Sequence, residues 1–165
     1  MPAKARPHRH DYAQLILFLT GEGVQTVNGR RRRARAGDLF VIPAGGGDFR
    51  KIETPLGPKG SPSFSPDGRW IAYYGQEGRG DWWKQTRLWV VPADGGGSAQ
   101  NLTERYDFNV SSWTINDMGS PAMMPPTWSN DGKTLYFQVA HHGNTVLKSA
   151  GLSSSKSASL DGDNL

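Results

Sequence analysis

Two pairs of segments in this chain repeat each other in a fixed order. Residues 62–74, PSFSPDGRWIAYY, align with residues 126–138, PTWSNDGKTLYFQ. Residues 39–54, LFVIPAGGGDFRKIET, align with residues 88–103, LWVVPADGGGSAQNLT. A third, partial copy of the second unit is VLKSAGL, residues 146–152. The chain is therefore built from a repeated unit, and its fold has to place equivalent strands in equivalent positions.

Each unit combines short strands with tight turns. In SPDG and SNDG, Pro or Asn sets the bend, Asp bonds its own backbone and Gly adopts positive φ. The flanking runs WIAYYG and LYFQV have the alternating or continuous apolar character of half-buried or buried strands. Repeats of about 40 to 50 residues with four strands each are typical of β-propeller blades. We therefore predict about two blades and part of a third, which is an incomplete propeller.

The first 45 residues also predict strands and no helix. LILFL at 15–19, VQTV at 24–27, RRRRARA at 30–36 and LFVIP at 39–43 are separated by Gly-containing turns. Asn28-Gly29 is a strong signal for a two-residue type I′ hairpin turn, because both of its central residues need positive φ. With 21 Gly, 11 Pro and no Cys, the composition also fits an all-β chain without disulfides or Cys-based zinc sites.

Residues 6–45 resemble the N-terminal cupin segment of AraC-type regulators. The matching residues of the two cupin motifs are His8, His10, Gln14 and Gly21, then Gly37, Pro43 and Gly45. Gln14 stands where the family has Glu, and Asp48 stands where it has a third His. The resemblance implies a pocket for a small effector such as a sugar, without metal.

The ligand-binding candidates follow from this resemblance: His8, His10, Tyr12, Gln14 and Arg32. Gln14, Arg32 and Tyr12 line a shallow polar cavity if the strands alternate as expected. In the alternative, His8 and His10 are solvated and Arg32 faces outward. Three residues, His8, His10 and Asp48, are weak candidates for a metal site, and we expect neither metal nor cofactor.

Basic residues are concentrated in the first third of the chain. Residues 1–50 hold nine Lys or Arg and four Asp or Glu, whereas residues 51–165 hold ten and eleven. The run Arg30–Arg33 attracts phosphate in principle. Because alternate strand residues face opposite ways, two arginines are expected on each face of a hairpin. A solvated hairpin face is the preferred interpretation, and we expect no nucleic-acid partner.

Residues 39–152 resemble the propellers of the prolyl-oligopeptidase family and of TolB-like proteins. In the peptidases, a propeller controls access to a separate hydrolase domain. The chain has no Gly-x-Ser-x-Gly nucleophile motif. His141 and His142 are interpreted as loop residues. We expect a non-catalytic binding or interaction module, and the alternative is a propeller fragment of a serine peptidase that lacks its hydrolase domain.

The two resemblances overlap at residues 39–46, which suggests a hybrid of two incomplete pieces. We divide the chain into a cupin-like fragment (1–45), propeller-like repeats (46–152) and a disordered, Ser-rich tail (153–165). An alternative is that residues 1–45 serve as an improvised blade ahead of the true ones. Exposed strand edges predict protein partners or self-association. We expect a cytoplasmic chain with no membrane partner.

Overall fold

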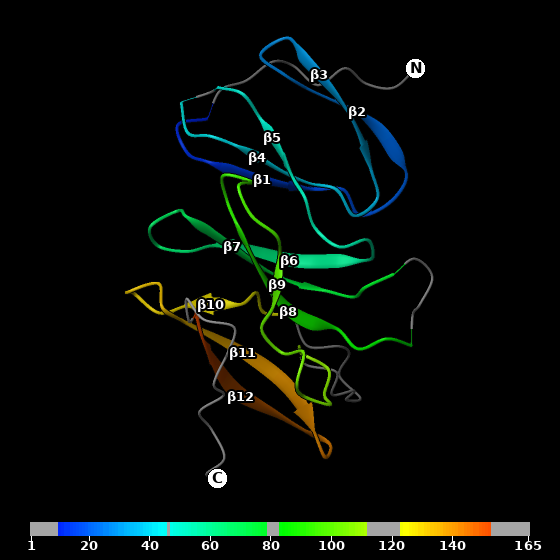
Figure 1. The fold of residues 1–165 in the computed structure, drawn as a ribbon, viewed down its shortest axis with the longest axis vertical. Coiled ribbons are helices and arrows are strands. Elements are labelled where there is room, and N and C mark those ends of the chain that lie inside the picture. The colour runs from blue at the N-terminus through cyan, green and yellow to red at the C-terminus, as the bar shows by residue number, and fades with distance from the viewer. Residues whose placement is uncertain (1–9, 46, 79–82, 112–122, 153–165) are drawn as a thin grey trace.

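The computed structural model describes residues 10–45, 47–78, 83–111 and 123–152, and within them it is all-β (Figure 1). This confirms the predicted fold class. In the described residues no helix has the length and apolar character needed to cross a membrane. The strands of the N-terminal part are β1 (Gln14–Leu17), β2 (Glu22–Val27), β3 (Arg30–Arg35), β4 (Leu39–Ile42) and β5 (Arg50–Ile52). The remaining strands are β6 (Lys59–Phe64), β7 (Trp70–Gly75), β8 (Arg87–Pro92), β9 (Gln100–Asn101), β10 (Thr127–Trp128), β11 (Thr134–His141) and β12 (Asn144–Gly151).

Three of the four antiparallel sheets are stacked along the long axis of the molecule, and the fourth is the two-stranded sheet of β2 and β3 (Figure 1). The first sheet has the order β1-β4-β5, the middle sheet β6-β7-β8-β9 and the third sheet β10-β11-β12. The four strands of the middle sheet follow one another in chain order, which is the arrangement of a propeller blade. Strands β4, β8 and β12 come from the three related sequence segments, and each pairs with the strand before it in its sheet. The repeats therefore occupy equivalent places.

The middle sheet is buried on both faces. Along β7 and β8, alternate residues enter two different cores, which explains why WIAYY and LWVV are continuous apolar runs. The face toward the first sheet forms a core that we call the upper core: Ile71, Tyr73, Trp89 and Val91 with Leu39, Val41 and Ile52. The opposite face forms the lower core: Ala72, Tyr74, Leu88 and Val90 with Leu135, Phe137 and Val139.

The first sheet is also covered on both faces. Leu15 and Leu17 pack against the upper core. The hairpin β2–β3, which we call the arginine hairpin, covers the other face, where Ile16 and Phe18 pack with buried Ala34, Phe40 and Phe49. This double coverage explains the unbroken apolar run LILFL, of which the structure assigns only Leu15–Leu17 to β1. The upper core thus contains residues from both sides of position 45.

Strand β4 has one partner from each of the two sequence patterns. It pairs with β1, from the cupin-like segment, with Leu17 opposite Leu39. On its other edge it pairs with β5, with Leu39 opposite Ile52. The stretch in which the two resemblances overlap is therefore the central strand of the first sheet.

Two hairpins use the same turn. Asn28 and Gly29 have φ values of 49° and 77°, which confirms the predicted type I′ turn between β2 and β3. His142 and Gly143, between β11 and β12, have φ values of 47° and 80°. His142 is thus a turn residue.

Because the middle sheet is buried on both faces, shortening one of its side chains should lower the free energy of unfolding strongly. Ile71→Ala should lower the free energy of unfolding by about 2 to 5 kcal/mol, because Ile71 is fully buried in the upper core. Val24→Ala is the matched control, since Val24 is 49% exposed, and it should change stability by less than about 0.5 kcal/mol. Urea unfolding followed by tryptophan fluorescence measures both. Equal effects of the two substitutions would contradict the burial of the sheet.

Candidate functional site

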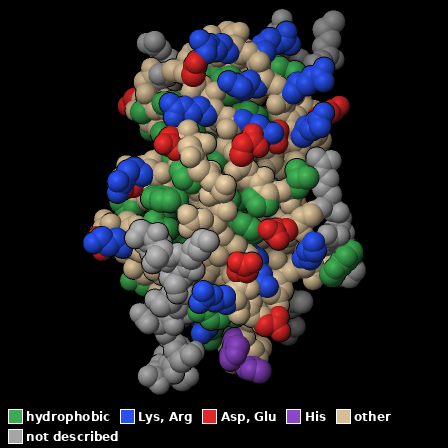
Figure 2. All heavy atoms as spheres, in the orientation of Figure 1, with side chains coloured by type: hydrophobic (Ala, Val, Ile, Leu, Met, Phe, Trp, Pro, Cys, Tyr) green, Lys and Arg blue, Asp and Glu red, His purple; other side chains and the backbone are tan. Residues whose placement is uncertain are grey.

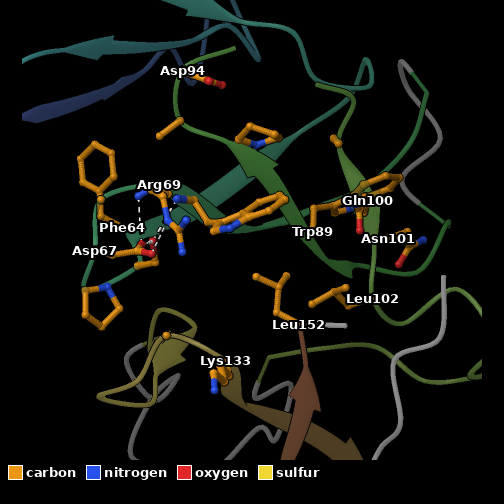
Figure 3. A pocket seen from close by; sticks show the side chains of 18 of the residues that line it. Phe64, Asp67, Arg69, Trp89, Asp94, Gln100, Asn101, Leu102, Lys133 and Leu152 are labelled. Atoms are coloured by element: carbon orange, nitrogen blue, oxygen red, sulfur yellow. Dashed lines mark hydrogen bonds and ion pairs between the residues drawn. The ribbon is translucent and has the colours of Figure 1, made fainter. Parts of the chain in front are cut away.

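An open groove of about 2060 Å³ runs past all three sheets (Figure 3). Its wall includes residues of the first sheet, such as Val41 and Arg50. The middle sheet contributes Trp89 and the segment around Gln100, and the third sheet contributes Lys133. In Figure 3, Asp67 and Arg69 lie on one side of Trp89, and Gln100 and Asn101 lie on the other. The groove therefore depends on the way the sheets stack.

The turn between β6 and β7 builds one wall through a compact hydrogen-bond network. Ser65 Oγ donates to Asp67 Oδ1 at 2.6 Å, and Arg69 N donates to the same oxygen at 3.0 Å. Trp70 N donates to Ser65 Oγ at 2.9 Å. Arg69 Nε reaches Asp67 Oδ2 at 2.6 Å. The hydrogen bond from Ser65 and those from Arg69 lower the pKa of Asp67 to about 2.

The turn between β10 and β11 repeats this network. Ser129 Oγ donates to Asp131 Oδ1 at 2.6 Å, Lys133 N donates to it at 3.1 Å, and Thr134 N donates to Ser129 Oγ at 2.9 Å. Hydrogen bonds from Ser129 and Lys133 lower the pKa of Asp131 as well. Both turns line the groove, each with a carboxylate and a cation. The sequence repeat thus places the same hydrogen-bonded turn twice in one site.

Aromatic residues form part of the apolar wall of the groove. Trp89 is nearly buried, stacks on Tyr73 with ring centroids 6.4 Å apart, and donates from Nε1 to Gly75 O at 3.2 Å. Tyr106 stacks on Phe108 at 5.4 Å. Phe64 and Trp70 complete this surface. These rings are fixed by packing, so the groove offers preformed apolar contacts.

Arg87 fixes the segment that follows β9. Its Nη1 donates to Thr103 O at 3.1 Å and to Tyr106 O. Burial lowers the pKa of Arg87, and the nearby carboxylates, of which Asp107 has the largest effect, oppose that shift. Thr86 N donates to Asn109 Oδ1 at 2.8 Å. This side of the groove is therefore tied to the middle sheet by hydrogen bonds.

Charges of both signs are distributed along the groove. The basic lining residues are Arg50, Arg69, Lys84, Arg87, Arg105 and Lys133. The acidic lining residues are Asp67, Glu77, Asp94, Glu104 and Asp131. Because the two sets nearly balance, the groove does not select strongly for anions or for cations.

Four of the five ligand-binding residues proposed from the sequence lie outside the groove. His8 is outside the described residues, as is the tail 153–165. His10 and Tyr12 have ring centroids 4.9 Å apart, and Tyr12 is largely exposed. Gln14 pairs with Ile42, and Arg32 lies 5.5 Å from the centroid of the Phe49 ring. None of the four candidates within the described residues lines the groove.

No metal-binding cluster of three or more His, Asp or Glu is present in the part of the chain that the structure describes. Asp48, one of the weak candidates, forms an ion pair with Arg30. His141 and His142 lie at the β11–β12 turn with ring centroids 4.2 Å apart. The groove was missed because its walls come from turns that are distant in sequence, although the repeated Ser-x-Asp-Gly signal marked two of them.

The repeated turn network predicts a pKa change that is specific to each turn. Ser65→Ala removes the hydrogen bond that lowers the pKa of Asp67 most, so this pKa should rise from about 2 toward 3.8 while that of Asp131 stays unchanged. Ser129→Ala should do the reverse. Carboxyl carbon NMR titration measures both residues in one sample. A pKa of Asp67 that stays near 2 in Ser65→Ala would contradict the network.

In the intact chain, the ionised form of Asp67 stabilises the fold above about pH 3.8, and this contribution is lost as the pH falls toward 2.

One protein family matches the N-terminal segment of the chain, and two solved structures align with most of it. The cupin domain family matches residues 2–47, which confirms the cupin resemblance of the first segment. No curated protein matches the chain. A structure of TolB from Acinetobacter baumannii aligns with 76% of this chain and 26% of its own, at 19% identity and a TM-score of 0.49. A structure of putative TolB from Agrobacterium tumefaciens aligns with 81% of this chain and 58% of its own, at 17% identity and a TM-score of 0.36. This chain thus spans only part of the length of the structures that it resembles. The resemblances to AraC-type regulators and to prolyl oligopeptidases stay predictions.

Proposed function

We propose that this chain is a non-catalytic binding module and that its groove takes an extended segment of a partner protein. The observation that carries the proposal is the size of the groove. Pockets for small molecules enclose about 300 to 1,000 Å³. The groove measures about 2060 Å³ and is open, so a single small ligand would leave most of it in water.

The lining supports a polypeptide ligand. A peptide presents amides along its backbone and side chains of every type. The groove offers carboxylates and cations at two turns, amide side chains at Gln100 and Asn101, and partly exposed aromatic rings at Trp70 and Tyr106. Because positive and negative groups nearly balance, the preferred segment has charges of both signs.

The non-catalytic part of the proposal rests on the sequence and on the histidines. The chain has no Gly-x-Ser-x-Gly motif. His141 and His142 contact each other at a hairpin turn and do not line the groove. The alternative, a propeller fragment of a serine peptidase, assigns the chemistry to a separate hydrolase domain.

The sugar-like effector is a second candidate, and it has a different location. Gln14 lies on the same sheet face as Ile16, which packs under the arginine hairpin, and Arg32 lies on the hairpin side that carries buried Ala34. Both side chains therefore belong to the space between the first sheet and the hairpin. The aromatic rings of Phe40 and Phe49 occupy much of that space, which leaves this candidate less room than the groove provides.

A bulky residue in the groove should block peptide binding. Peptides selected from a random 12-residue phage library on the intact chain provide the probe. Gln100→Trp should weaken a selected peptide at least about tenfold, since it fills exposed groove space beside Asn101. Thr26→Trp, on an exposed hairpin position outside the groove, is the matched control and should leave the affinity unchanged.

Isothermal titration calorimetry gives the affinities. A library that yields no binder, or binders that are insensitive to Gln100→Trp, would contradict the proposal. Binding of a simple sugar that is lost in Arg32→Ala but kept in Gln100→Trp would support the second candidate instead.

A further inference from the structure

The arginine hairpin sorts its five arginines into two sets. Cross-strand pairing places Arg30 opposite Val27 and Arg32 opposite Gln25. Val27 packs into the core under the hairpin and Ala34 is buried there, so Arg30, Arg32 and Ala34 share the inward face. Arg31, Arg33 and Arg35 therefore share the outward face.

The two inward arginines already have partners. Arg30 forms an ion pair with Asp48, and Arg32 lies over the ring of Phe49 at 5.5 Å. Asn28 Nδ2 donates to Gly47 O at 3.2 Å. Three alternate hairpin residues thus bind three consecutive residues of the β4–β5 loop. These contacts hold the hairpin in place and leave its outward face free to act as a surface.

The outward arginines have no such partners. All three are exposed, and none forms an ion pair within the described part of the chain. The one acidic residue in the hairpin sequence is Glu22, opposite Arg35. Figure 2 shows Lys and Arg side chains gathered at the end of the molecule where Figure 1 places β2 and β3. Glu22 shares the outward face with Arg35, so this face carries three cations and one carboxylate. The remaining excess of positive charge favours an anionic partner.

We propose that the outward face of the arginine hairpin binds the phosphodiester backbone of nucleic acid without sequence preference. Successive residues on one side of a strand are about 6.6 Å apart, because a strand rises about 3.3 Å per residue. Phosphates of one DNA strand advance about 3.4 Å along the duplex axis. Along the duplex axis, the spacing between successive outward arginines therefore corresponds to about two phosphate steps of one DNA strand.

The side chains of this face favour phosphate over other anionic surfaces. Arginine presents a planar fork that matches phosphate, and all three cations are arginine. Insertion into a membrane interface needs Trp, Phe or Leu beside the basic residues, and the outward face has only Val24. Val24, Thr26 and Glu22 also provide little means of recognising bases, which explains why we expect no sequence preference. The split expected for Arg30–Arg33, two on each face, is the one the structure has, and Arg35 adds a third arginine to the outward face.

Fluorescence anisotropy with a labelled 20-base-pair duplex DNA tests the proposal on the full chain. Three phosphate contacts give a slope of about −2.7 in log K against log salt, so raising salt from 50 to 200 mM should lower their contribution to affinity about 40-fold. Replacing Arg31, Arg33 and Arg35 together by Gln should make this slope less negative by about 2.7. Replacing the same three by Lys should keep the slope and weaken binding only several-fold, because the charge stays and the fork is lost.

Two controls separate the face from net charge and from unfolding. Replacing Arg79, Lys148 and Lys156 by Gln removes three charges elsewhere in the sequence and should leave the slope unchanged. Melting curves should match the wild type for the hairpin variants, since the altered side chains are exposed. A wild-type slope in the triple Gln variant, or no DNA binding at 50 mM salt, would overturn the proposal. Binding to vesicles containing phosphatidylserine, or to heparin, without binding to DNA would overturn it as well.

Discussion

The fold depends on a sheet that has no polar face. Strands β7 and β8 place Ile71 and Trp89 on one side and Ala72 and Val90 on the other, and all four are buried. A sheet of this kind is stable only when apolar partners cover both faces. The first sheet covers one face and the third sheet covers the other. The stacked arrangement is thus a consequence of two short apolar runs.

The same arrangement explains how a cupin-like segment and a repeat segment form one structural unit. Strand β4 accepts β1 on one edge and β5 on the other, so the first sheet is completed by strands from both patterns. Its Leu39 and Val41 then cover the middle sheet. Because the sheets stack in this way, the two Ser-x-Asp-Gly turns line one groove, with Gly132 next to Pro66. The proposed binding site is therefore a product of the stacking and does not belong to one repeat alone.

Local features could be predicted from the sequence, and long-range ones could not. The Asn28-Gly29 turn and the apolar runs of β4, β7 and β8 follow from backbone sterics and burial, which act over a few residues. The pairing of β1 with β4 bypasses the hairpin β2–β3, and no local pattern specifies such a pairing. The alternation rule separated the arginines by face but did not identify which set would meet Asp48 and Phe49. The groove could not be predicted from the sequence either, because residues of its walls, such as Asp67 and Lys133, are more than sixty residues apart.

Native-state hydrogen exchange measured by NMR tests the central claim, that the first and middle sheets form one structural unit. If the upper core joins them, the amides of Phe40 in β4 and Val90 in β8 should open with the same free energy, equal to that of global unfolding, and should respond equally to low concentrations of urea. Both residues are fully buried, which makes them matched probes. Exchange of Phe40 through a separate opening of much lower free energy, with Val90 still protected, would show that the cupin-like segment folds apart from the repeats and would contradict the account.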